Sequence, residues 1–104
     1  MNEADEDGMA PLYIACEKGH LEVARMLLSA DGIEPNPANA YNQTPVNIAS
    51  YNGYLEVVRL LLSRPGLDIT MEDKWGDAPE ASARKKGHTA IASLLREHAA
   101  TSAD

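Results

Sequence analysis

The sequence contains little cysteine, few aromatic residues and no long apolar run. Its 104 residues include 1 Cys, no Phe, 4 Tyr and 1 Trp. A single thiol cannot form an internal disulfide, which fits a reducing compartment. No apolar run approaches the roughly 18 residues that a membrane span needs, and residues 1–9 lack the basic start and apolar middle of a signal peptide. We therefore expect a soluble, intracellular protein, cytoplasmic or nuclear.

Basic residues are also scarce. Lys and Arg number 9 against 16 Asp and Glu, for a formal net charge of −7, and the acids are concentrated in residues 1–34. Nucleic acids and anionic membranes are bound by clustered basic side chains. The basic cluster of this chain is the short run at 84–86, and the acidic field around it weakens its attraction for anions. We expect neither nucleic acid nor membrane as a partner.

What the chain does have is an internal repeat. The segment "GHLEVARMLLS" begins at Gly19, and "GYLEVVRLLLS" begins 34 residues later at Gly53. A period of this length is typical of stacked units, each of which buries its apolar face against its neighbour. Rows of 34 residues align three copies, with matching columns at Pro11, Pro45 and Pro79, at Ala15, Ala49 and Ala83, at Gly19, Gly53 and Gly87, and at Leu27, Leu61 and Leu95.

Each copy is predicted to fold as two short helices joined by a tight turn. Proline suits the first turn of a helix because its missing N–H needs no partner there, and Thr44 can cap the helix that begins at Pro45. Glycine in the left-handed conformation can end that helix. Apolar residues at helical spacing then predict a second helix, as Leu55, Val58 and Leu61 show. The connectors are rich in Gly, Pro, Asn and Asp, so we expect turn or hairpin order in them.

These columns resemble those of the ankyrin repeat family over about residues 5–98. The three copies read "DEDGMAPLYIACEKGHLEVARMLL", "NAYNQTPVNIASYNGYLEVVRLLL" and "DKWGDAPEASARKKGHTAIASLLR". The resemblance implies an all-α, ankyrin-type solenoid of helix-turn-helix repeats joined by turn or hairpin loops. It implies a single domain over 1–104, with repeats at about 5–38, 39–72 and 73–98 and a tail at 99–104.

Two departures from the family pattern carry expectations of their own. The motif Thr-Pro-Leu-His is replaced by "APLY", "TPVN" and "APEA", which predicts a less firmly braced turn. The third copy places Glu80, Ser82 and Arg96 where the other copies are apolar, which predicts a polar C-terminal cap. The first copy shows no such substitution, so we expect a monomer or weak self-association through an uncapped N-terminal repeat.

Residues suited to catalysis or metal binding are few and scattered. His20 and His88 share the column that follows the turn glycine, with Tyr54 between them, which favours a bracing role over catalysis. One Cys and three His do not supply a zinc site. Cys16 shares a column with Ser50, which favours a small packed side chain over a reactive thiol. We expect no enzyme, no cofactor and no metal.

Binding residues can be assigned only through the resemblance. In this family the partner usually meets a concave surface made of the hairpin tips and the exposed face of the first helix of each repeat. Aromatic residues there are typical of interface hot spots. Carried over by column, the predicted partner-binding residues are Glu6, Asp7, Met9, Glu17, Lys18, Tyr41, Gln43, Tyr51, Asn52, Lys74, Trp75, Asp77, Lys85 and Lys86.

Two functions remain open from the sequence. The first is a non-catalytic protein-protein interaction module that binds a protein partner through the concave face. The second is a structural or scaffolding segment, or a segment selected for stability, of a longer ankyrin array, with no dedicated partner site. The surface columns differ in every copy, which favours binding, but a spacer under neutral drift would vary there too. Trp75 and Tyr41 could be presented to solvent or could pack along the hairpin stems.

Overall fold

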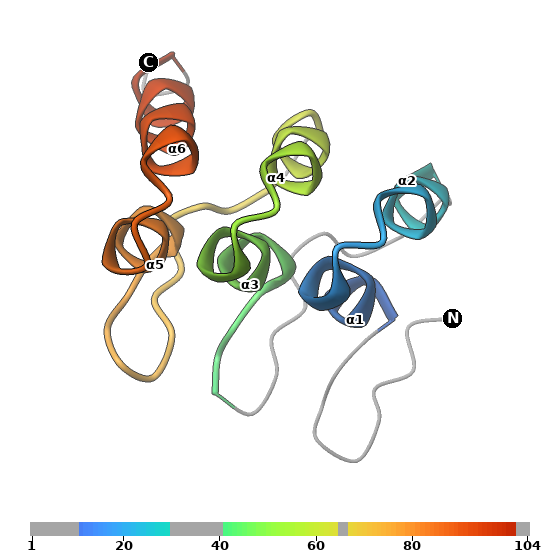
Figure 1. Cartoon of the computed structure of the whole chain (residues 1–104), viewed down its shortest axis with the longest axis horizontal. Helices are drawn as coiled ribbons and strands as arrows, with labels where there is room; N and C mark the ends of the chain where they lie inside the picture. Colours follow the sequence, from blue (N-terminus) through green and yellow to red (C-terminus); the bar gives the residue numbers. More distant parts are fainter. Residues whose placement is uncertain (1–10, 30–40, 65–66, 102–104) are drawn as a thin grey trace.

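The computed structural model describes residues 11–29, 41–64 and 67–101. Regular structure within these ranges is helical, with no strand, and forms three helix–turn–helix pairs (Figure 1). The predicted all-α solenoid of helix-turn-helix repeats is therefore confirmed. The helices are α1 (Pro11–Lys18), α2 (Leu21–Ser29), α3 (Pro45–Asn52), α4 (Leu55–Leu62), α5 (Pro79–Lys85) and α6 (Thr89–Thr101).

The first helix of each pair begins at the predicted proline. Thr44 caps α3, where its hydroxyl oxygen accepts a hydrogen bond from the backbone N–H of Asn47 at 3.3 Å. Ala78 precedes α5 and offers no side-chain cap. Because proline needs no N–H partner and is preset for helical φ, the start of α5 tolerates the missing cap.

Left-handed glycines turn the chain between the two helices of each pair, as predicted. Gly19, Gly53 and Gly87 have φ of 73°, 84° and 80°, values that cost glycine little and other residues more. The next backbone N–H then bonds back to the carbonyl of the repeated alanine, which satisfies a helix end that would otherwise lack a partner. These bonds join His20 to Ala15 at 2.9 Å, Tyr54 to Ala49 at 3.0 Å and His88 to Ala83 at 2.8 Å.

The pairs stack in two layers. Helices α1, α3 and α5 form one row, and α2, α4 and α6 form a second (Figure 1); α3 contacts both α1 and α5, and α4 contacts both α2 and α6. The core lies between the rows and between successive pairs. Its fully buried members include Leu12, Val46, Val58, Leu61 and Leu95. Each pair therefore supplies part of its neighbour's core.

The loop before a helix pair is called its hairpin below; its described residues are 41–44 before α3 and 67–78 before α5. Hydrogen bonds from one pair to the next hairpin replace the bracing that the altered motif was expected to lose. The Tyr13 hydroxyl donates to Oε1 of Gln43 at 3.0 Å, and the Asn47 side-chain amide donates to the backbone carbonyl of Asp77 at 3.0 Å. Both donors stand in the motif's histidine column, where the third copy has Ala81. The expectation of weaker bracing was wrong for these two copies, because the tyrosine and the asparagine each bind the next hairpin.

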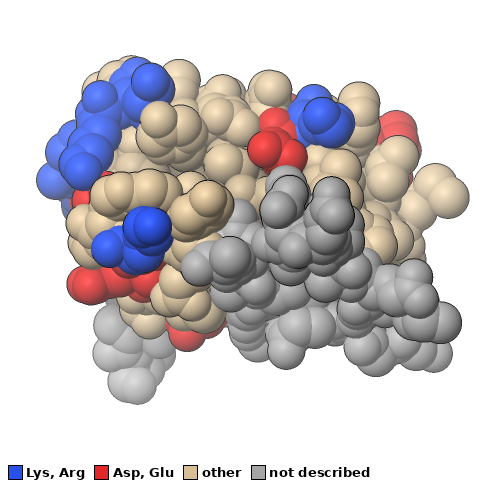
Figure 2. All heavy atoms as spheres, turned by 90° about the horizontal axis from the view of Figure 1, so that it is seen from below, with Lys and Arg blue, Asp and Glu red and all other residues tan. Residues whose placement is uncertain are grey.

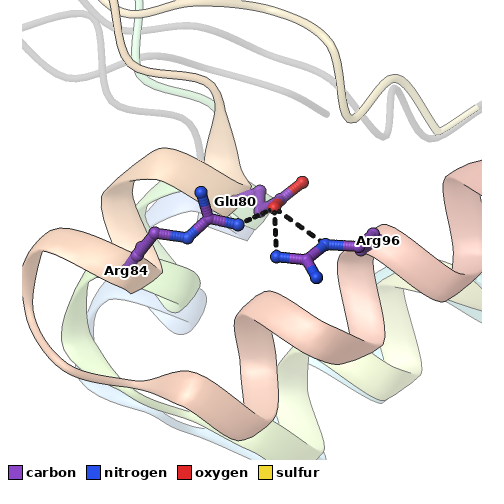
Figure 3. Close-up of polar contacts among 3 residues, drawn as sticks. All are labelled: Glu80, Arg84 and Arg96. Atoms are coloured by element: carbon purple, nitrogen blue, oxygen red, sulfur yellow. Dashed lines mark hydrogen bonds and ion pairs between the residues drawn. The ribbon is translucent and has the colours of Figure 1, made fainter.

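The polar cap predicted for the third copy is present in part. Glu80 on α5 accepts hydrogen bonds from Arg84 on the same helix and from Nε and Nη2 of Arg96 on α6, the last two at 3.3 Å (Figure 3). Ser82, however, is only 1% exposed. Its assignment to the outer face was wrong: it stays buried in the last pair that the structure describes, so its column does not face outward at this end.

Candidate functional site

Two aromatic rings from successive hairpins stack against each other at the tips. The centroids of Tyr41 and Trp75 are 5.7 Å apart, with 27° between the ring planes. Both rings remain open to solvent, at 47% and 59% exposure. The backbone N–H of Lys74 donates to the carbonyl of Tyr41 at 2.9 Å and fixes the two hairpins together. Residues Tyr41, Lys74 and Trp75 are called the tip cluster below.

The Lys74 ammonium lies over both rings of the tip cluster. Its Nζ is 4.8 Å from the Tyr41 centroid and 5.5 Å from that of Trp75. A cation within about 6 Å of an aromatic face is attracted by the ring quadrupole. Lysine and rings therefore form one exposed unit.

Asp73 shapes the hairpin that carries this cluster. Its buried carboxylate accepts the backbone N–H groups of Trp75 at 2.9 Å and Asp77 at 3.0 Å. The left-handed Gly76, with φ of 84°, completes the turn and donates to the Asp73 carbonyl at 2.9 Å. Asp73 was not among the predicted site residues. The Asp-x-x-Gly spacing, "DKWG", was the available signal, since aspartate favours this kind of side-chain-to-backbone turn.

The C-terminal end of α5 continues the same face. Nζ of Lys85 lies 2.7 Å from Oδ2 of Asp77, so an ion pair joins the helix to the hairpin. This hydrogen bond raises the pKa of Lys85. The next residue, Lys86, places its ammonium 5.1 Å from the ring centroid of Tyr51, which lies exposed near the end of α3. The structure thus brings four predicted residues of this region into two contacts.

Of the remaining predicted residues, four lie in the described part of the chain and three lie outside it. Asn52 donates to the backbone carbonyl of Glu17 at 3.0 Å and ties the ends of α3 and α1 together. Lys18, which follows Glu17 in the sequence, is exposed. The side chain of Gln43 accepts the hydrogen bond from the Tyr13 hydroxyl. Three further predicted residues lie outside the described part of the chain, and these are Glu6, Asp7 and Met9.

Figure 2 views the molecule from the side of the hairpins. Lys and Arg side chains gather at the left-hand end of this view, which belongs to α5, α6 and the hairpin before them in Figure 1. Positive charge on this face is therefore concentrated on the third pair, in a chain whose net charge is −7.

Two rings of the column that follows the turn glycine pack on the turn of a neighbouring pair. The ring of Tyr54 lies about 3 Å from where a Cβ on Gly19 would sit, and the ring of His88 lies 2.6 to 2.9 Å from where one on Gly53 would sit. Each ring packs on the turn of the preceding pair, which is the predicted bracing role for this column. His20 is exposed and has no preceding pair within the described residues.

Cys16 is fully buried. Burial raises the pKa of its thiol from 9.0 to about 12, so the thiolate that reacts with electrophiles is suppressed at neutral pH. Across the described ranges, no three His, Cys, Asp or Glu side chains gather as metal ligands, and no helix is long and apolar enough to cross a membrane.

A stack of helix–turn–helix pairs with left-handed glycine turns and projecting hairpins defines a helical repeat solenoid. A family model for ankyrin repeats in three copies matches residues 1–73, and the chain belongs to the ankyrin repeat family. No curated protein matches the sequence. Repeats of this family are generally non-catalytic modules of protein–protein interaction.

Proposed function

We propose that this chain is a non-catalytic protein-binding module whose partner rests on the hairpin tips and the C-terminal ends of α3 and α5. The observation that carries the proposal is the exposed stack of Tyr41 on Trp75. Large aromatic side chains are costly to leave in water and dominate interface hot spots. A stacked pair held by hydrogen bonds within and between hairpins is also preorganised, so that little rotamer entropy is lost on binding.

The proposal is tested by selecting binders from a displayed library of protein fragments with the full chain as bait. Trp75→Ala is expected to weaken the selected fragments by about tenfold or more, as truncation of a hot spot does, with an unchanged melting temperature. Met26→Ala is the matched control, because Met26 is 71% exposed on α2, away from the tip cluster. The proposed face would be contradicted if both variants lost the same affinity. It would also be contradicted if Trp75→Ala lowered the melting temperature together with the affinity.

One observation favours a second role, as a segment of a longer repeat array or a weakly self-associating unit. Val23 and Met26 form an exposed apolar patch on α2. If the patch binds another helix pair, sedimentation velocity at high concentration should show association of this chain that Met26→Lys abolishes. Sedimentation as a monomer at every concentration would contradict association through this patch.

A further inference from the structure

We propose that the partner segment bound by the tip cluster is acidic, with carboxylates that meet the ammonium groups of Lys74 and Lys86. This inference rests on the proposed function, since it names the chemistry of what the same face binds. Its basis is the set of contacts that the charged groups between Asp73 and Glu97 make, in the part of the chain where positive charge is concentrated.

The carboxylates of this part are largely occupied by groups of their own pair. Asp73 is buried and accepts two backbone N–H groups, and Asp77 is paired with Lys85. Glu80 accepts both Arg84 and Arg96 (Figure 3). Glu97 lies on α6, which belongs to the second row of helices. The carboxylates of Asp73, Asp77 and Glu80 therefore have partners other than Lys74 and Lys86.

Lys74 and Lys86 form no ion pair with the described residues. Each ammonium lies over an aromatic ring instead, Lys74 over the tip cluster and Lys86 over Tyr51. In the sequence Lys74 and Lys86 lie on either side of Asp77 and Lys85, whose ion pair joins the hairpin to the end of α5. Glu72 precedes Asp73 and is exposed; its carboxylate forms no ion pair with the described residues, and its backbone carbonyl accepts the Asn42 amide. The face thus presents two cations, each beside an exposed aromatic surface.

Such an arrangement suits a segment in which carboxylates alternate with apolar side chains. The carboxylates would meet the two ammonium groups, and the apolar side chains would cover Trp75, Tyr41 and Tyr51. Charge complementarity of this kind raises the association rate and selects the partner's sign of charge.

The test uses two synthetic peptides of equal length that share their apolar residues and carry glutamate or lysine at every polar position. Trp75 is the sole tryptophan, so its emission reports binding at the tip cluster directly. The glutamate peptide is expected to shift Trp75 emission and to displace the selected fragments, and the lysine peptide to do neither. The selected fragments are expected to be richer in Asp and Glu than the library they came from.

The double variant Lys74→Gln/Lys86→Gln is expected to weaken the glutamate peptide about fivefold at low salt, from two exposed ion pairs of ordinary strength. The effect should shrink as salt screens the charges. Arg59→Gln is the matched control: it removes one positive charge from α4, where Arg59 pairs with Glu56, and should change affinity less than twofold.

The outcomes separate this inference from the proposed function. Fragments that depend on Trp75 but are neutral or basic would overturn the acidic partner and leave the binding face intact. An absence of any fragment that depends on Trp75 would overturn both. A single-stranded oligonucleotide that binds more tightly than the glutamate peptide, with the same dependence on Lys74 and Lys86, would overturn the assignment to a protein segment.

Discussion

The first and the third helix pairs are the outermost pairs that the structure describes, and their outward faces differ. On the side that faces the following pair, Leu12 and Val46 are fully buried, whereas the same column in the third pair holds Glu80. Cys16 and Ser50 are buried likewise, and their column ends in Arg84. Here the sequence itself changes at the end of the stack, from apolar or small to charged.

The side that faces the preceding pair shows no such change. Val57 and Ile91 are each 2% exposed, while Val23 in the same column is 47% exposed. All three positions hold a β-branched apolar residue, but among the described residues only Val57 and Ile91 have a preceding pair to pack against. The comparison teaches that position in the stack, more than side-chain type, decides which apolar residue of this chain is core.

The largest effect is expected from placing the same charge at two positions of one column. Val57→Asp should lower the free energy of unfolding by about 4 kcal/mol or more, because an unpaired carboxylate would be buried between pairs. Val23→Asp should change it by less than about 0.5 kcal/mol, as surface substitutions do. Urea unfolding followed by circular dichroism measures both. Similar losses in the two variants would show that the described surface of α2 is covered.

The turn glycines give the second comparison. Gly53→Ala forces a left-handed φ on alanine and pushes its Cβ into the ring of His88, whereas a Cβ on Gly87 meets nothing within 4 Å. We expect a loss of about 1 kcal/mol for Gly87→Ala from backbone strain alone and about 3 kcal/mol for Gly53→Ala, where the packed ring must also move. Thermal melts of the two variants would contradict this account if they coincide.

The buried thiol of Cys16 makes the stability of the chain depend on pH, whereas the exposed Arg84 in the same column of the third pair does not. The folded chain holds the Cys16 proton up to a pKa of about 12, while the unfolded chain releases it near 9.0. Stability should therefore fall as pH rises above 9.0 and level off near 12, with a loss of about 1.4 kcal/mol by pH 10. Burial and the nearby Glu17 also raise the pKa of Tyr13, so the Cys16 part is isolated by difference. In Cys16→Ala the stability lost between pH 9 and pH 10 should be smaller by about 1 kcal/mol; an identical slope would contradict the assignment.

The smallest effect is expected at the charged end of the stack. Glu80→Gln removes the shared acceptor of Arg84 and Arg96 and should lower the free energy of unfolding by about 0.5 to 1 kcal/mol at low salt, and less at high salt, as exposed ion pairs do. Glu56→Gln is the control, because among the described residues that carboxylate pairs with Arg59 alone, on an exposed helix face. A control as damaging as Glu80→Gln would remove the capping role of this cluster.

The fold could be predicted from the sequence because the repeat itself carries it. Proline recurs where the first helix of each copy starts, and glycine recurs where the chain turns. Alanine recurs where a backbone carbonyl accepts the hydrogen bond that closes the helix end, and leucine recurs in the core. Thr44 was recognised as a cap for the same reason, since its role is local. The ends of the helices follow from these signals within each copy, without knowledge of the neighbouring copy.

The candidate site depended on contacts between copies, which columns alone do not give. Tyr41 and Trp75 were assigned to the tips, but the alternative of packing along the stems stayed open because stacking joins two hairpins 34 residues apart. Ser82 was misassigned because polarity was taken as exposure, and a serine can be buried wherever its hydroxyl finds a partner. The hydrogen bonds from Tyr13 and Asn47 were missed because each acceptor lies 30 residues later in the sequence, in the next copy.

The central claim is that the chain presents a rigid aromatic surface to a partner, and quenching of Trp75 fluorescence by iodide tests it most directly. Trp75 is the sole tryptophan and is 59% exposed. The account predicts red-shifted emission that iodide quenches readily, in a chain that melts cooperatively by circular dichroism. Blue-shifted emission shielded from iodide would place Trp75 in hairpin packing and contradict the proposed binding face.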